Sequence, residues 1–182
     1  MKAYIEPGRV FGVVTAPPSK SMAHRLLLCA GLAKGQSVID RVQPSQDILA
    51  TARALEALGA RVDVENGRAR VTGCGGHLAV PKGPVDCGES GSTLRFFIPL
   101  LAGCGGPVRL LGHGRLMQRP QDVYARLFAQ RGLPFSQSGD GLTLCGPLPP
   151  GEYRVEGGVS SQFISGLLLA LPLLDGDSVL QV

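Results

Sequence analysis

Charged residues are scarce in this chain of 182 residues: 18% are Asp, Glu, Lys or Arg, whereas 44% are hydrophobic. That balance excludes a disordered chain and is sufficient for one domain with a sizeable core. Aromatic residues make up only 5%, and no dense basic stretch is interleaved with them, so nucleic-acid binding is not favoured. The net charge is nevertheless +4, which fits either simple solubility or a small anionic substrate.

The chain also lacks any cysteine pattern typical of metal or disulfide sites. Its five cysteines are odd in number, widely spaced, and contain no Cys-x-x-Cys pair, which argues against both roles. We expect Cys29 and Cys104, in or beside apolar segments, to fill the core. The apolar run at residues 163–174 is too short to span a bilayer. Residues 1–12 lack the apolar segment of a signal peptide, so we expect a reduced, cytoplasmic location.

Small hydroxyl residues and a lysine stand just before an apolar helical run. Ser19, Lys20 and Ser21 precede residues 26–30. Backbone N–H groups, hydroxyls and a positive charge would then meet where a helix begins. This combination predicts an anion site, although an ordinary serine N-cap beside a solvated lysine would produce the same local pattern.

The same pattern recurs with a period of about 70 residues. Aligning Arg25, Arg95 and Gly166 superposes three segments that each contain an apolar helix, a small-residue stop and a short strand. These segments are residues 26–39, 96–110 and 167–180. A polar junction precedes each of them, at residues 19–21, 89–93 and 160–162. The sequence therefore predicts three helix N-termini of the same kind.

The second half of the unit repeats as well. Gln-Asp pairs at 46–47 and 121–122 each open a helix that a glycine closes, and we expect Asp47 and Asp122 to be caps rather than acids. Each helix is followed by a hairpin that turns through Asn-Gly or Asp-Gly. Strands are expected before the first helix of each unit, at residues 12–15, 84–87 and 152–155. The predicted unit is βαβαββ.

Four motifs in this order and spacing resemble the EPSP synthase (3-phosphoshikimate 1-carboxyvinyltransferase) family. They are Pro-Ser-Lys-Ser at 18–21 with Arg25, Gly-Ser-Thr-Leu-Arg at 91–95, Arg119-Pro120 after Gly-His-Gly at 112–114, and Val-Ser-Ser-Gln-Phe at 159–163. The related UDP-N-acetylglucosamine enolpyruvyl transferases typically carry asparagine after the leading lysine. Here Ser21 follows Lys20.

The resemblance implies an α/β (α+β) fold of the enolpyruvyl transferase type, an inside-out α/β barrel with two domains of three βαβαββ units each. Residues 13–75 and 76–150 would be two complete units of the N-terminal domain, and 151–182 an incomplete third. Residues 1–12 would be a strand of the second domain. The chain is therefore expected to be a fragment of a longer enzyme, inactive alone and able to self-associate through its open edge, whereas the full-length enzyme would be a monomer.

The resemblance further implies a reaction in aromatic amino acid biosynthesis, within the shikimate pathway to chorismate. The enolpyruvyl group of phosphoenolpyruvate moves to the 5-hydroxyl of shikimate 3-phosphate, without a metal or organic cofactor. The site must hold two phosphates and two carboxylates close together, for which preorganised N–H groups and arginines are suited. Gly91 fits the form that admits the herbicide glyphosate to the same site.

Site residues are carried over from the family position by position. Lys20 would contact both substrates and take part in proton transfer. Ser21 and Arg25 would hold the shikimate moiety, while Gly91 and Arg119 would contact phosphoenolpyruvate. The remaining contacts to shikimate 3-phosphate would come from Ser160, Ser161 and Gln162.

Four further residues are less clear in role. Arg95 is as compatible with packing as with ligand contact, and His24, on a helix face, and His113, in a loop, are expected to have no proton role. Glu89 stands where many members have asparagine, and its carboxylate would repel phosphoenolpyruvate unless paired or turned away. Two alternatives remain open: a stand-alone, non-catalytic anion-binding module, and a relative of the UDP-N-acetylglucosamine enolpyruvyl transferases. An RNA 3′-phosphate cyclase is disfavoured because its nucleotide-handling motifs are not seen.

Overall fold

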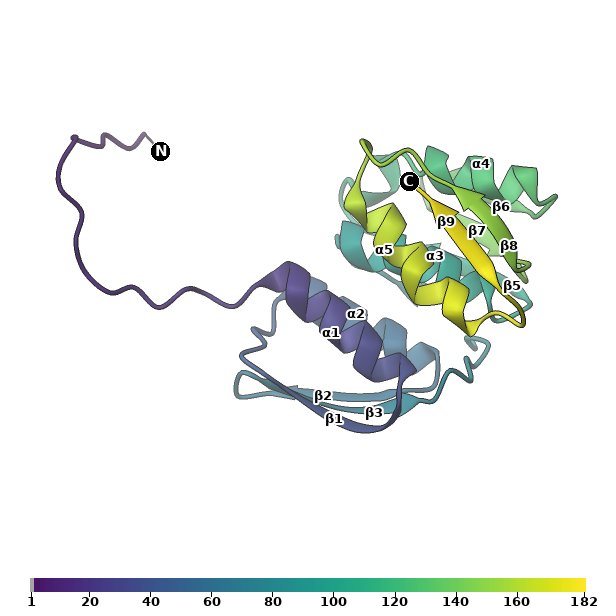
Figure 1. Ribbon diagram of the computed structural model, residues 1–182, viewed down its shortest axis with the longest axis horizontal. Helices are drawn as coiled ribbons and strands as arrows, with labels where there is room; N and C mark the ends of the chain where they lie inside the picture. Colours follow the sequence, from purple (N-terminus) through teal and green to yellow (C-terminus); the bar gives the residue numbers. More distant parts are fainter. Residues whose placement is uncertain (1) are drawn as a thin grey trace.

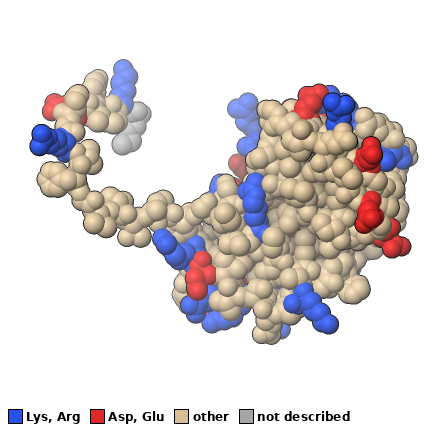
Figure 2. Space-filling model, viewed as in Figure 1, with Lys and Arg blue, Asp and Glu red and all other residues tan. Residues whose placement is uncertain are grey.

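The computed structural model describes residues 2–182, and its first eighteen described residues form neither helix nor strand. They extend away from the folded part of the chain (Figures 1 and 2). One recorded contact comes from Arg41 Nη2, which donates a hydrogen bond to Ala16 O at 2.9 Å. The strand predicted at residues 12–15 is therefore wrong for this structure, because Val13 and Val14 are exposed and a strand requires a hydrogen-bonded neighbour.

The first unit places two helices on one face of a three-stranded sheet (Figure 1). Its elements are α1 (Lys20–Leu32), β1 (Lys34–Asp40), α2 (Gln46–Ala57), β2 (Arg61–Glu65) and β3 (Arg68–Cys74). The strand order is β1-β3-β2, with both pairs antiparallel. The hairpin turns through Asn66 and Gly67, both at positive φ, as the Asn-Gly pair predicts.

The second unit contains the complete predicted pattern. Its elements are β4 (Val85–Asp86), α3 (Gly91–Ala102), β5 (Pro107–Leu111), the short 3₁₀ helix η1 (Leu116–Gln118), α4 (Asp122–Gln130), β6 (Phe135–Ser138) and β7 (Gly141–Cys145). The strand order is β4-β5-β7-β6. Because β4 pairs parallel to β5, the helix between them makes the crossover that parallel neighbours require.

The third unit is represented by its first half. It comprises β8 (Gly151–Arg154), α5 (Ser161–Ala170), the 3₁₀ helix η2 (Leu171–Leu173) and β9 (Ser178–Gln181). β8 pairs parallel to β9, as β4 does to β5, so the predicted strand-helix-strand repeat is confirmed for the second and third units. Within residues 2–182, no helix is long and apolar enough to cross a membrane.

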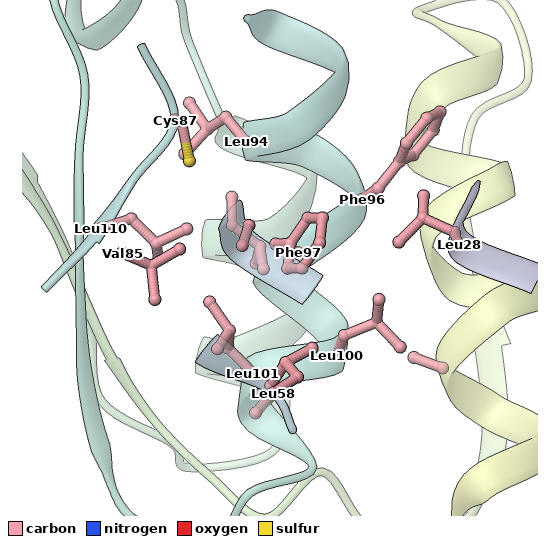
Figure 3. Close-up of a cluster of buried hydrophobic side chains, with 14 of the residues drawn as sticks. Leu28, Leu58, Val85, Cys87, Leu94, Phe96, Phe97, Leu100, Leu101 and Leu110 are labelled. Atoms are coloured by element: carbon pink, nitrogen blue, oxygen red, sulfur yellow. The ribbon is translucent and has the colours of Figure 1, made fainter. Parts of the chain in front are cut away.

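Helix α3 is the centre of the core. Phe96, Phe97 and the leucines of its later turns are fully buried, which is typical of a helix that is apolar on every side. Figure 3 shows Phe96 on the same side of the helix as Leu28 of α1, while Val85 and Leu110 of the sheet lie on the other side. Burying each such side chain contributes about 1.5–3 kcal/mol.

Helix α3 also contains a proline, and the structure compensates for it. Pro99 has no N–H to donate to the carbonyl of Arg95, four residues earlier. The buried hydroxyl of Tyr124 donates to that carbonyl at 2.6 Å instead. A Cβ on Gly166 of α5 would lie 2.4 Å from the same hydroxyl and 2.7 Å from the same carbonyl. Gly166 therefore allows α5 to approach α3 closely.

Two sequence expectations about side chains are wrong. Asp47 and Asp122 are not N-caps: Ser45 caps α2, accepting from the Ile48 N–H, and Gln121 precedes α4 without a side-chain cap. Cys29 does not fill the core but is exposed, because it continues an exposed stripe on α1. The stripe also contains Met22 and Leu26, at helical spacing. Cys104 is partly buried.

Candidate functional site

Three helices begin with a serine cap at the positions where the sequence predicts polar junctions. The hydroxyl oxygens of Ser19, Ser90 and Ser160 accept hydrogen bonds from backbone N–H groups in the first turns of α1, α3 and α5. Each cap satisfies one of the free N–H groups at its helix end, and the others stay available to an anion. Ser21 and Ser161 lie exposed in the first turns of α1 and α5.

Side-chain contacts bring these helix ends together. Gln162 connects α5 to α3: its Nε2 donates to Ser92 Oγ at 2.8 Å, and its Oε1 accepts from Arg95 Nη1 at 2.8 Å. Arg25 connects α1 to α5, because its Nη2 donates to Ser165 Oγ at 3.0 Å. Each contact joins residues in the first two turns of two helices, so α1, α3 and α5 run parallel with their N-termini at one end. Their macrodipoles therefore add there.

Helix α2 contributes a carboxylate to the same end. Lys20 Nζ lies 2.6 Å from Asp47 Oδ2, and the two side chains are 58% and 28% exposed. An ion pair this exposed contributes at most about 1 kcal/mol. Its consequence for the site is therefore mainly geometric: Asp47 holds the ammonium group of Lys20 at the start of α1.

Gly91 and Arg119 are also brought into contact. A Cβ built on Gly91 would lie 2.8 Å from Arg119 Nη1, so glycine allows the guanidinium to lie against the first residue of α3. Arg119 follows η1, whose carbonyls and N–H groups form a tight turn after the Gly-His-Gly loop. A donor fork beside a helix N-terminus suits a phosphate or carboxylate.

Arg95 is a second guanidinium at this end. Its carbon Cζ lies over the Phe163 ring, 4.6 Å from the centroid, and its Nε is buried without a hydrogen-bond partner among the described residues. Burial, followed by the charge of Arg119, lowers the pKa of Arg95. These contacts give Arg95 a clear packing role, and its proximity to Arg119 adds positive charge to the site.

His24 does not lie on an open helix face. It is buried, and its Nδ1 lies 2.7 Å from Thr51 Oγ1. Thr51 Oγ1 is in turn 2.7 Å from Thr93 Oγ1, which donates to Ser90 Oγ at 2.8 Å. Burial is the main cause that lowers the pKa of His24 to about 4; Asp47 opposes it, and the nearby cations Lys20 and Arg25 add to it.

This buried polar chain joins the first two turns of α1, α2 and α3, and sequence reasoning missed it. Thr51 and Thr93 stand in largely apolar helices, where a threonine carries no signal of its partner. The only available hint is that Thr93 is the third residue of α3 and Thr51 the sixth residue of α2, so both stand in the first two turns of their helices.

Glu89 is exposed and turned towards the loop before η1. A Cβ on Gly114 would lie 2.6 Å from Glu89 Oε1, so the carboxylate lies against this glycine. The neighbouring His113 is not isolated, because its Nε2 is 3.1 Å from Asp86 Oδ2. For Asp86, burial raises the pKa, but the Gly88 N–H and His113 outweigh it, so the net pKa is lowered.

The cations of the site are not part of a large basic patch on the face that Figure 2 shows. On the face shown in Figure 2, Lys and Arg side chains are scattered among uncharged residues. In the part of the chain that the structure describes, no three His, Cys, Asp or Glu side chains are grouped so as to hold a metal ion. The arrangement is therefore one of convergent N–H groups, hydroxyls and cations, suited to binding anions.

Comparisons with known proteins match the sequence and the fold of this chain to a family. The family described as EPSP synthase (3-phosphoshikimate 1-carboxyvinyltransferase) matches residues 5–182. The 3-phosphoshikimate 1-carboxyvinyltransferases of Clostridium kluyveri and Clostridium beijerinckii are 46% and 43% identical over 180 and 182 residues. Those alignments cover 98% and 96% of this chain but 42% of each relative. The chain thus spans about two-fifths of their length.

A solved structure agrees with the fold. The EPSP synthase of Acinetobacter baumannii superposes with a TM-score of 0.81 at 25% identity, covering 93% of this chain and 40% of that one. The predicted α/β fold class is therefore confirmed. On the extent of the family match and the agreement in fold, this chain belongs to the EPSP synthase family.

Proposed function

We propose that this chain forms the shikimate 3-phosphate-recognising part of an enzyme that transfers the enolpyruvyl group of phosphoenolpyruvate to the 5-hydroxyl of that substrate, releasing phosphate. One observation carries the proposal: the parallel N-termini of α1, α3 and α5 gather Lys20, Arg25, Arg95 and Arg119. Of these four cations, only Lys20 has a carboxylate partner among the ion pairs of the described residues. Excess positive charge of this kind favours an anionic ligand.

The α5 end is the proposed phosphate site of shikimate 3-phosphate. Ser160 and Ser161 supply hydroxyls and N–H groups at a helix N-terminus, where the dipole favours a phosphate. Gln162 would contact the shikimate ring, and its bonds to α3 fix its orientation. Ser21 and Arg25 would bind the shikimate moiety from α1, with Arg25 oriented by Ser165.

The α3 end is the proposed phosphoenolpyruvate site. Gly91 would offer a backbone N–H, and Arg119 would bind an anionic group through two parallel N–H donors, in bidentate geometry. In the reaction, the vinyl carbon gains a proton, the 5-oxygen loses its proton and bonds to the neighbouring carbon, and a tetrahedral adduct forms. Loss of phosphate and of a proton from the former vinyl carbon gives the product. Lys20, close to both proposed sites, would move a proton and neutralise charge that develops in the adduct.

We also infer the surroundings of the enzyme. All five cysteines are free, which supports a reducing, cytoplasmic location. Residues 1–12 are assigned to the second domain, since Tyr4, Ile5, Val10 and Phe11 are almost fully exposed and need a covering surface. The full-length enzyme is proposed to be a monomer, and the chain alone to self-associate through uncovered strand edges.

Isothermal titration of the chain with shikimate 3-phosphate tests the proposal, first alone and then with phosphoenolpyruvate present. We expect saturable binding of shikimate 3-phosphate. Ser161→Ala should weaken it by about 1–3 kcal/mol, because a phosphate donor is lost, whereas Ser136→Ala, at an exposed position of β6, should bind like the parent. A folded chain that does not bind, or equal affinity in Ser161→Ala, would contradict the assignment.

A further inference from the structure

The backbone carbonyl of Arg119 accepts hydrogen bonds from two glutamine side chains. Gln121 Nε2 donates to it at 3.2 Å and Gln137 Nε2 at 3.0 Å. The same Gln137 amide also donates to Met117 O at 2.7 Å. One amide of β6 thus holds two carbonyls, one within η1 and one directly after it, in the segment that brings the Arg119 guanidinium against Gly91.

Gln137 stands at a position where the fold favours an apolar residue. Along β6, Phe135 and Gln137 are half-buried and the alternate serines are exposed. The Phe135 ring packs against Phe128 of α4, with centroids 5.1 Å apart, so this face of the strand points into the core. A polar amide there is favourable only when it is hydrogen-bonded.

The internal repeat gives a second, independent reason. Ser138 pairs with Gly141 across the hairpin of the second unit, as Glu65 pairs with Arg68 in the first. Gln137 therefore corresponds to Val64, which packs against the core in the first unit. The polar residue appears in the unit whose adjoining loop carries Arg119.

We propose that Gln137 is a positioning residue for Arg119, through which the sheet of the second unit fixes the place of this guanidinium. With its own carbonyl and that of Met117 both held, the backbone of Arg119 cannot shift freely, so the point from which its side chain extends to Gly91 is held in place. Gln121 lies two residues away and moves with the same segment, whereas β6 belongs to a paired sheet. That the clamped ligand is phosphoenolpyruvate rests on the proposed function; the positioning itself does not.

Two variants of similar shape test the positioning. Gln137→Glu and Gln137→Met keep the length of the side chain and remove both N–H donors, and exposed Ser136→Ala is the control on the same strand. By hydrogen exchange with mass spectrometry, we expect residues 116–119 to exchange about tenfold faster in both variants, as loss of one or two ordinary hydrogen bonds implies. Exchange of α3 and β5 should match the parent and Ser136→Ala.

Measurements of substrate affinity on the same variants distinguish a positioning role of Gln137 from a general loss of stability in the second unit. With shikimate 3-phosphate saturating, affinity for phosphoenolpyruvate should fall severalfold in both variants, while affinity for shikimate 3-phosphate stays unchanged. Unchanged exchange at residues 116–119, or an equal rise across the whole second unit with both affinities reduced together, would overturn the proposal. If local exchange rises as expected but the parent binds neither substrate, the positioning is supported and the proposed function fails.

Discussion

The buried imidazole of His24 makes the stability of this protein depend on pH in a specific way. His24 is 1% exposed, and its Nε2 has no hydrogen-bond partner among the described residues. Burial, together with the nearby Lys20 and Arg25 and against the attraction of Asp47, lowers its pKa from 6.5 to about 4. In the unfolded chain the imidazole has its ordinary pKa, so the unfolded state binds a proton first as the pH falls.

The sign and size of the effect follow from this difference. Because the pKa in the folded state is the lower one, the contribution of His24 is fully present above about pH 6.5 and is lost as the pH falls towards 4. At about 1.4 kcal/mol per pH unit, the drop from 6.5 to about 4 corresponds to about 3 kcal/mol. About 2 kcal/mol of this should already be lost between about pH 7 and about pH 5.

The assay compares denaturant unfolding of the parent and His24→Asn at several pH values, followed by far-ultraviolet circular dichroism because the chain has no tryptophan. Carboxylates titrate in both proteins, so the difference between their free energies of unfolding isolates the imidazole. We expect this difference to shrink on acidification by about 2 kcal/mol between about pH 7 and about pH 5. His77→Asn, which removes an exposed imidazole, should follow the parent. A difference between parent and His24→Asn that stays constant with pH would refute the reasoning.

Three further changes test other parts of the structure. Tyr124→Phe should lower the free energy of unfolding by about 1–3 kcal/mol, because it leaves the buried Arg95 carbonyl without its donor; chemical unfolding at the parent's stability would contradict this. Gly91→Ala should weaken phosphoenolpyruvate binding in titrations with little change in melting temperature, since the new Cβ displaces only the mobile end of Arg119; unchanged affinity would remove Arg119 from the site. Lys20→Met in the intact enzyme should abolish turnover while circular dichroism stays like the parent's, and steady-state rates equal to the parent's would exclude its proposed role.

Local pattern was enough to predict most helices and strands. The serine caps at Ser19 and Ser160, the Asn-Gly turn and the apolar helices depend on neighbours within a few residues. The three-fold recurrence then predicted three helix N-termini of the same kind, and the contacts of Gln162 and Arg25 show that they lie at one end. Where the sequence prediction failed, as for the strand at residues 12–15, the element requires a partner strand that local pattern cannot supply.

In the candidate site, too, some features follow from local sequence and others depend on tertiary packing. The sequence determined which residue types stand at each helix start, because capping and dipole interactions act within one turn. Only the tertiary structure decided that Asp47 pairs with Lys20, that Thr51 and Thr93 join His24, and that Gln137 holds Arg119. These partners are separated by 18 to 42 residues along the chain, and they meet because burial of the apolar faces around α3 fixes the helices against one another. Packing of the helices around α3 therefore determines which side chains that are far apart in the sequence form hydrogen bonds with one another.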